Sequence, residues 1–197
     1  MSFLNLAAIR ECTEAEGPGK RFALWCQGCQ RRCPGCCNPH MQPLVPAHIL
    51  DVNDVKELIM ESKRQHGIEG ITCIGGEPFL QSEGIAELVC WCQENGLSVM
   101  IFTGYTFAEL QDMICKGDTN TKVILDHTDI LVDGPFIEEQ YDTERDWVGS
   151  TNQKVILLTD RYNKGVEYEK QTMTQAYEAI MADLAPEYQG YKENPDQ

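Results

Sequence analysis

The chain has 197 residues, and 42% of them are hydrophobic, which is typical of a single soluble globular domain with its own core. Asp and Glu number 31 against 16 Lys and Arg, and the resulting net charge of −15 argues against nucleic-acid binding. No secretory signal is visible, and no stretch approaches the roughly eighteen apolar residues that a membrane span needs, so we expect a cytoplasmic protein without membrane association.

In chain order the patterns predict a strand at 22–25, a helix at 51–65, a strand at 68–74, a helix at 82–95, a strand at 97–102, a helix at 106–115, strands at 129–132 and 155–159, and a helix at 171–184. Asp51, Ser82 and Thr106 are the expected N-caps, and Glu109 completes a capping box with Thr106. Residues from about 185 onward predict a flexible tail on a single domain spanning 1–197.

Alternating strands and helices predict an α/β fold with a largely parallel sheet and outer helices. About five strands are too few to close an eight-stranded barrel, so we expect an open partial (β/α) barrel. Functional residues of such sheets gather at the carboxyl ends of the strands. Here those ends are a cysteine loop after residue 25 and the segments 75–78, 103–104 and 133–135, which we expect to face one cavity.

The cysteine loop contains Cys29-x3-Cys33-x2-Cys36, and Gly75-Gly76-Glu77-Pro78 follows some forty residues later. In a reducing compartment, clustered cysteines bind metal more often than they form disulfides. Three thiolates can hold three irons of a 4Fe-4S cluster and leave the fourth iron open to a small chelating molecule. The pattern therefore indicates an enzyme.

Two other metal sites compete with this interpretation. A zinc ribbon separates its two CxxC pairs by about fifteen to twenty residues, whereas Cys26-x2-Cys29 and Cys33-x2-Cys36 lie only three apart. A ferredoxin-like electron carrier would have another cysteine where Ala23 stands, and it would leave the glycine-rich strand ends without a role.

Six motifs occur in a fixed order: Gly17-Pro18-Gly19, Gly28-Cys29-x3-Cys33-Pro-Gly-Cys36-x-Asn38, Gly75-Gly76-Glu77-Pro78, Thr103-Gly104-Tyr105-Thr106, Val132-Asp133-Gly134-Pro135-Phe136 and Gly149-Ser150-Thr151-Asn152-Gln153. This set resembles the small radical S-adenosylmethionine enzymes over roughly residues 10–160, and within them the activating enzymes of anaerobic ribonucleotide reductase. The chain departs from that pattern at Gly35, where many members have an aromatic residue, and at Cys37, where a ring usually follows the last cluster cysteine.

The resemblance implies a fold of the radical S-adenosylmethionine type, a 4Fe-4S cluster held by Cys29, Cys33 and Cys36, and S-adenosylmethionine as the second cofactor. The residues that it implies as cofactor contacts are Gly35, Cys37, Gly75, Gly76, Glu77, Pro78 and Thr103. No further catalytic side chain is implied. Asp133 is interpreted as a turn residue, whereas Asn152 and Gln153 either close the cofactor site or begin a polar strand.

By the same resemblance, an electron from a flavodoxin or ferredoxin allows reductive cleavage of S-adenosylmethionine to a 5′-deoxyadenosyl radical. That radical takes hydrogen from the substrate, which we expect to be a glycine of a partner glycyl radical enzyme such as anaerobic ribonucleotide reductase. The alternative is a radical S-adenosylmethionine enzyme of a biosynthetic pathway that modifies a peptide or small molecule, and an electron carrier is the third hypothesis.

Overall fold

A computed structural model describes residues 2–162 of the chain. Its strands are β1 (Phe3–Thr13), β2 (Arg21–Cys26), β3 (His48–Asp51), β4 (Gly70–Gly75), β5 (Ser98–Phe102), β6 (Ile130–Asp133) and β7 (Lys154–Leu157). Its α-helices are α1 (Val52–His66), α2 (Ser82–Glu94), α3 (Phe107–Cys115) and α4 (Thr119–Asp126). Single 3-10 turns lie at Pro39–Met41, Pro78–Gln81, Glu138–Gln140 and Asp160–Tyr162.

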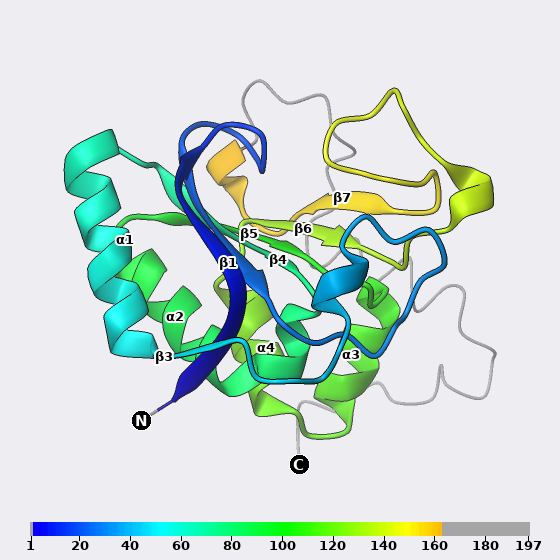
Figure 1. The fold of residues 1–197 in the computed structure, drawn as a ribbon, viewed down its shortest axis with the longest axis horizontal. Helices are drawn as coiled ribbons and strands as arrows, with labels where there is room; N and C mark the ends of the chain where they lie inside the picture. Colours follow the sequence, from blue (N-terminus) through cyan, green and yellow to red (C-terminus); the bar gives the residue numbers. More distant parts are fainter. Residues whose placement is uncertain (1, 163–197) are drawn as a thin grey trace, which may run out of the picture.

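The described strands form one seven-stranded sheet in the order β3-β1-β2-β4-β5-β6-β7. The four central strands β2, β4, β5 and β6 run parallel, which confirms the predicted parallel sheet for that part of it. Because this order advances in one direction, right-handed crossovers place the connecting helices on one face of the sheet. Figure 1 shows the helices gathered along one side of the strands.

The three remaining strands, β1, β3 and β7, pair antiparallel with their neighbours. The sequence did not predict β1 or β3, and the expected number of five strands was wrong. Register shifts interrupt β1 against β2, and much of β1 is exposed, so its residues do not alternate regularly between apolar and polar. β3 has only four residues, none of them buried, and gives no apolar run.

The helix boundaries follow their capping chemistry. Asp51 Oδ1 accepts a hydrogen bond from the N–H of Asn53 at 2.8 Å, and the predicted capping box between Thr106 and Glu109 is present at the start of α3. The cap expected at Ser82 was wrong, because the turn Pro78–Gln81 runs directly into α2 and makes Ser82 its first residue. The short helix α4 was not predicted, and the expected helix at 171–184 and the tail from about 185 lie outside the described residues.

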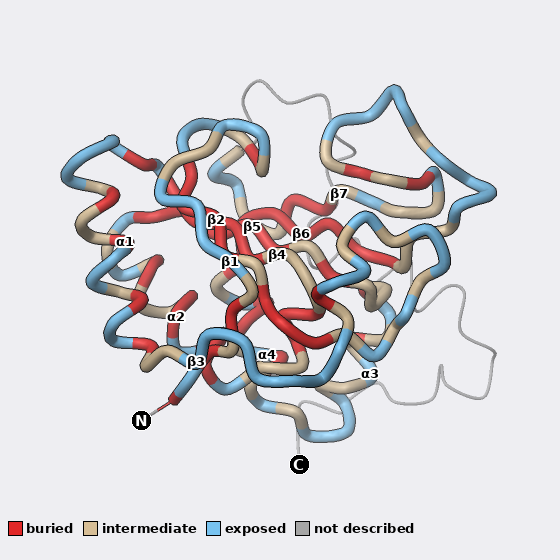
Figure 2. The backbone as a smooth tube through the Cα atoms, in the orientation of Figure 1, coloured by how far each residue is buried: buried red, intermediate tan, exposed pale blue. Residues whose placement is uncertain are grey.

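The core lies between the central strands and the helices. Its buried members include Leu24 of β2, Ile71 of β4, Ile59 of α1 and Leu88 of α2. Figure 2 shows the central strands buried, whereas the loops and the outer turns of the helices are exposed. Within residues 2–162, no helix combines the length and the apolar composition that crossing a membrane would require.

Candidate functional site

The carboxyl ends of β2 and β4 are joined by two backbone hydrogen bonds. The N–H of Gly76 donates to the carbonyl of Cys26, and the N–H of Glu77 donates to the carbonyl of Gly28, both at 2.8 Å. Gly76 lies so close to the cysteine loop that an added Cβ would stand 2.8 Å from the carbonyl carbon of Gly28. A side chain at this position would therefore push the loop away from β4.

The carboxylate of Glu77 joins the end of β4 to the end of β5. Oε1 accepts hydrogen bonds from the N–H of Phe79 at 3.0 Å and from the hydroxyl of Thr103 at 2.8 Å, and Oε2 accepts one from the N–H of Gly104 at 2.8 Å. Glu77 is buried, and this burial raises its pKa to about 7 although all three hydrogen bonds act in the opposite direction. Glu77 thus holds the two strand ends together.

Asp133 joins the end of β6 to the starts of α3 and β7. Its Oδ2 accepts from the N–H of Phe107 at 2.8 Å, at the start of α3, and its Oδ1 accepts from the N–H of Lys154 at 3.1 Å, at the start of β7. The N–H of Gly134 donates to the carbonyl of Tyr105 at 2.8 Å. Both carboxylate oxygens therefore accept backbone hydrogen bonds, as the interpretation of Asp133 as a turn residue implies.

Asn152 and Gln153 fasten the segment after β6 to the start of β7. The side-chain amide of Asn152 donates to the carbonyl of Pro135, and that of Gln153 donates to the carbonyl of Gly134, both at 2.9 Å. The carbonyl oxygen of the Gln153 side chain also accepts from the N–H of Gly149 at 2.8 Å. These contacts give both residues a bracing role at the strand ends.

The cysteine loop begins where β2 ends, at the carboxyl edge of the parallel strands. Cys29, Cys33 and Cys36 are each partly exposed, and none of the ten cysteines forms a disulfide. Cys26 is buried in β2, whereas Cys37 is exposed next to Cys36. The loop thus presents the three cysteines of the predicted ligand set and turns Cys26 into the core.

Backbone N–H groups form hydrogen bonds with two of the three thiols. The N–H of Asn38 donates to Sγ of Cys36 at 3.4 Å. Partial burial raises the pKa of Cys29, and hydrogen bonds from the backbone of Arg31 and Arg32 oppose that rise. N–H groups aimed at sulfur stabilise a thiolate, which is the form that binds iron.

The donor set fits an iron–sulfur cluster in its chemistry. Three reduced, partly exposed thiols stand on one loop, and backbone N–H groups act on Cys29 and Cys36. Within the described part of the chain, no three His, Cys, Asp or Glu side chains converge into a preformed metal site. The loop therefore carries three thiols of the type that binds such a cluster.

The other residues expected to contact a cofactor lie around this loop. Gly75 has a φ of 103°, and an added Cβ would stand 2.8 Å from the backbone of Trp25 and Cys26. Gly35 has a φ of 69°, and the carboxylate of Glu138 lies beside it. Thr103 is buried, and its hydroxyl both donates to Glu77 and accepts from the N–H of Tyr105 at 3.1 Å.

Sequence reasoning missed three side chains at this edge, namely Arg31, Tyr105 and Glu109. Arg31 lies over the ring of Tyr105 and forms an ion pair with Glu109. The sequence signalled only the helix-capping role of Glu109, because the contact joins residues more than seventy positions apart.

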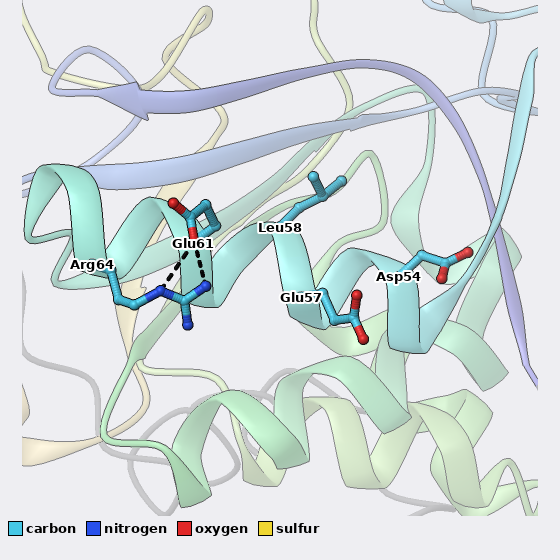
Figure 3. Close-up of a pocket in the computed structure, with 5 residues that line it drawn as sticks. All are labelled: Asp54, Glu57, Leu58, Glu61 and Arg64. Carbon is cyan, nitrogen blue, oxygen red and sulfur yellow. Dashed lines mark hydrogen bonds and ion pairs between the residues drawn. The ribbon is translucent and has the colours of Figure 1, made fainter.

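A separate shallow pocket lies along the outer face of α1, drawn in Figure 3. It is lined by Asp54, Glu57, Leu58, Glu61 and Arg64. Arg64 donates a hydrogen bond to Glu61 one turn away, as solvated helix pairs commonly do. In Figure 1, α1 and the cysteine loop lie on opposite sides of the view, so this pocket is not part of the strand-end site.

Comparison with known proteins identifies the family. The family described as a 4Fe-4S single cluster domain matches residues 15–156. The anaerobic ribonucleoside-triphosphate reductase-activating protein of Enterobacteria phage T4 is 29% identical over 161 residues, covering 80% of this chain and 96% of its own. The proteins of the same name from Vibrio cholerae and Escherichia coli K12 are 31% and 30% identical, cover 73% and 72% of this chain, and are each matched over 91% of their own length.

The chain therefore belongs to the 4Fe-4S single cluster domain family and, within it, to the anaerobic ribonucleoside-triphosphate reductase-activating proteins. This membership confirms the family that the motifs indicated, the activating proteins of anaerobic ribonucleotide reductase, together with its 4Fe-4S cluster. Among solved structures, QueE from Escherichia coli aligns over 53% of each chain with a TM-score of 0.45 and 18% identity, which is too slight a likeness to support an argument.

Proposed function

We propose that this protein activates an anaerobic ribonucleoside-triphosphate reductase by removing a hydrogen atom from one of its glycines. The family relatives are named as activating proteins of that reductase, and the chain spans nearly their whole length. The observation that carries the proposal is the placement of Cys29, Cys33 and Cys36 on one loop at the carboxyl edge of the parallel strands, with Gly76 and Glu77 against its base.

We assign Cys29, Cys33 and Cys36 as the iron ligands. The thiol of Cys26 points into the core and is fully buried, which favours leaving it out of the ligand set. The cluster and S-adenosylmethionine supply, when bound, the one-electron chemistry by which a hydrogen atom is taken from the substrate. The protein supplies the ligands, the backbone groups around them and the strand ends that shape the site.

The cofactor contacts are assigned around the loop. Gly75 and Gly76 leave the backbone free of side chains on the approach to the cysteines, and Glu77 with Pro78 holds the turn that follows β4. Gly35 and Cys37 flank the last ligand, and Thr103 lies at the end of β5. Because Glu77 already accepts three hydrogen bonds, its role in this proposal is to position Thr103 and Gly104.

The remaining parts of the proposal concern setting and partners. We propose a cytoplasmic enzyme of one domain whose open sheet curves as a partial barrel, since an open side suits a protein substrate that inserts a loop. A flavodoxin or ferredoxin is the proposed electron donor. The strongly acidic composition favours a partner with a basic surface.

The test is anaerobic reconstitution of the full chain with iron and sulfide, followed by reduction in the presence of S-adenosylmethionine. We expect about four irons per chain and formation of 5′-deoxyadenosine. Adding the reductase should then give a glycyl radical signal by electron paramagnetic resonance. Cofactor cleavage without that signal would favour the alternative, a biosynthetic radical enzyme, and a stable cluster without cleavage would favour an electron carrier.

A further inference from the structure

Arg31 connects the cysteine loop to helix α3. It stands between Cys29 and Cys33 in the sequence, and its guanidinium carbon lies 4.1 Å from the centroid of the Tyr105 ring. Its Nη2 lies 2.7 Å from Oε2 of Glu109. The Nε and Nη2 atoms are buried and make no hydrogen bond within residues 2–162, so the Tyr105 ring and the ion pair with Glu109 are the contacts of this charge.

The carboxylate that receives Arg31 is itself held in place. Oε2 of Glu109 accepts hydrogen bonds from the N–H of Thr106 at 2.7 Å and from its hydroxyl at 3.0 Å. These bonds belong to the capping box at the first turn of α3, which fixes the Glu109 side chain. Arg31 therefore contacts a rigid anchor rather than a freely rotating surface carboxylate.

The stem of Arg31 lies directly on the end of β5. An added Cβ on Gly104 would stand 2.8 Å from Cγ of Arg31, so the absence of a side chain at Gly104 leaves the space that the stem occupies. The N–H of Gly104 donates a hydrogen bond to Glu77, and this bond fixes the backbone on which the Arg31 stem lies. Stem, guanidinium and ring thus make one continuous contact between the loop and the strand ends.

The neighbouring residue provides a contrast. Arg32 is exposed and has a φ of 48°, and its side chain makes no hydrogen bond or ion pair within residues 2–162. The two arginines carry the same charge in the same loop, but only Arg31 is anchored. A general effect of positive charge near the cysteines would be common to both, whereas an anchoring effect belongs to Arg31 alone.

We propose that Arg31 is a positioning residue that, through Tyr105 and Glu109, holds residues 29–33 in the conformation that receives the iron–sulfur cluster. We call this contact of Arg31 with Tyr105 and Glu109 the Arg31 clasp. The inference rests on the proposed assignment of Cys29 and Cys33 as iron ligands. Because the side chain of Arg31 is anchored, its backbone N–H stays beside the Cys29 sulfur.

The first measurement uses the full-length protein without its cluster. The alkylation rates of individual cysteines are followed by mass spectrometry under anaerobic conditions for wild type, Arg31→Gln, Glu109→Gln, the double variant and the control Arg32→Gln. Gln at position 109 preserves the capping-box residue type while it removes the charge. We expect Cys29 and Cys33 to react roughly fivefold faster in Arg31→Gln and in Glu109→Gln than in wild type. The double variant should react at the same rate as either single variant, and Arg32→Gln should react at the wild-type rate.

The second measurement follows the reconstituted protein. Loss of the clasp should change the electron paramagnetic resonance spectrum of the reduced cluster and speed the loss of iron to a chelator in Arg31→Gln, with Arg32→Gln unchanged. Restoration of the wild-type spectrum by Arg31→Lys would show that the charge alone acts, and would overturn the role of the stacked guanidinium.

Equal alkylation rates in Arg31→Gln and Arg32→Gln would overturn the proposal. If Arg31→Gln does not fold, Glu109→Gln decides the question, because it leaves Arg31 in place and removes only its partner. If the wild-type chain binds no cluster, the proposed function fails, while the alkylation rates still decide whether the clasp exists.

Discussion

The hydroxyl of Thr103 donates a hydrogen bond of 2.8 Å to Oε1 of Glu77, and this contact joins the end of β5 to the turn that follows β4. Glu77 follows Gly75-Gly76 in the motif that first indicated a cofactor site, yet its carboxylate is buried and turned toward the neighbouring strand. The motif thus combines two tasks. The glycines let the cysteine loop approach β4, and the glutamate fixes the edge on which that loop rests.

The buried carboxylate of Glu77 predicts a pH dependence of stability. Its pKa rises from the ordinary 4.5 to about 7 in the folded protein, so between these values the native state binds more protons than the unfolded state. Stability therefore falls as pH rises through this window, by about 3 kcal/mol. Urea unfolding at pH 5 and pH 8 should show this loss in wild type.

The matched variant for this prediction is Glu77→Gln, which cannot titrate. The stability difference between pH 5 and pH 8 should be smaller in the variant by the same amount, since all other titrating groups are shared. An identical pH dependence in the two proteins would mean that Glu77 has an ordinary pKa.

Alanine substitution of the three proposed iron ligands should have a much larger effect on cluster binding and activity than substitution of Cys26. Cys29→Ala, Cys33→Ala and Cys36→Ala should each lose cluster iron and abolish formation of 5′-deoxyadenosine, because each removes one of three thiolates. Cys26→Ala should retain most of both, since its thiol lies in the core. Iron analysis and the 5′-deoxyadenosine assay check this, and cofactor cleavage by Cys29→Ala would refute the ligand assignment.

Gly76→Ala should separate the cysteine loop from β4. The added Cβ would overlap the carbonyl group of Gly28, which cannot move without breaking the hydrogen bond that it accepts from Glu77. We expect a loss of about 2–3 kcal/mol in stability together with a loss of cluster binding. Denaturant unfolding and iron analysis provide the measurements.

The control for Gly76→Ala is Gly67→Ala. Gly67 ends α1 with a φ of 66°, and no atom of residues 2–162 stands within 4 Å of an added Cβ, so alanine there brings backbone strain of roughly 1 kcal/mol without a clash in that part of the chain. This variant should keep its cluster. Comparable iron loss in both variants would show that general destabilisation, rather than the Gly28 contact, is responsible.

Asp133 should behave as a structural residue. Asp133→Asn replaces one carboxylate oxygen by an amide group that faces a backbone N–H, of Phe107 or of Lys154, and leaves that buried donor unpaired. A loss of about 1–2 kcal/mol follows. Asp51→Asn is the control, because Asn caps a helix as well as Asp. Loss of cofactor cleavage in folded Asp133→Asn would instead assign Asp133 to the chemistry.

Much of the fold could be predicted from the sequence because its signals are local. The capping residues Asp51 and Thr106 predicted the starts of α1 and α3, and the apolar runs predicted the four parallel strands. The strands β1 and β3 were not predicted from the sequence. A strand that is interrupted by bulges or exposed along its length owes its pairing to its neighbours rather than to its own pattern of residues.

The candidate site likewise has features that the sequence predicted and features that only the tertiary structure shows. The sequence by itself predicted the ligand chemistry, because the spacing of Cys29, Cys33 and Cys36 and the glycines at 75 and 76 are properties of a continuous chain. Only the tertiary structure decided that Glu77 braces Thr103 and that Arg31 reaches Tyr105 and Glu109. Such contacts join residues far apart in the chain, and they exist because parallel strands bring their carboxyl ends to one edge.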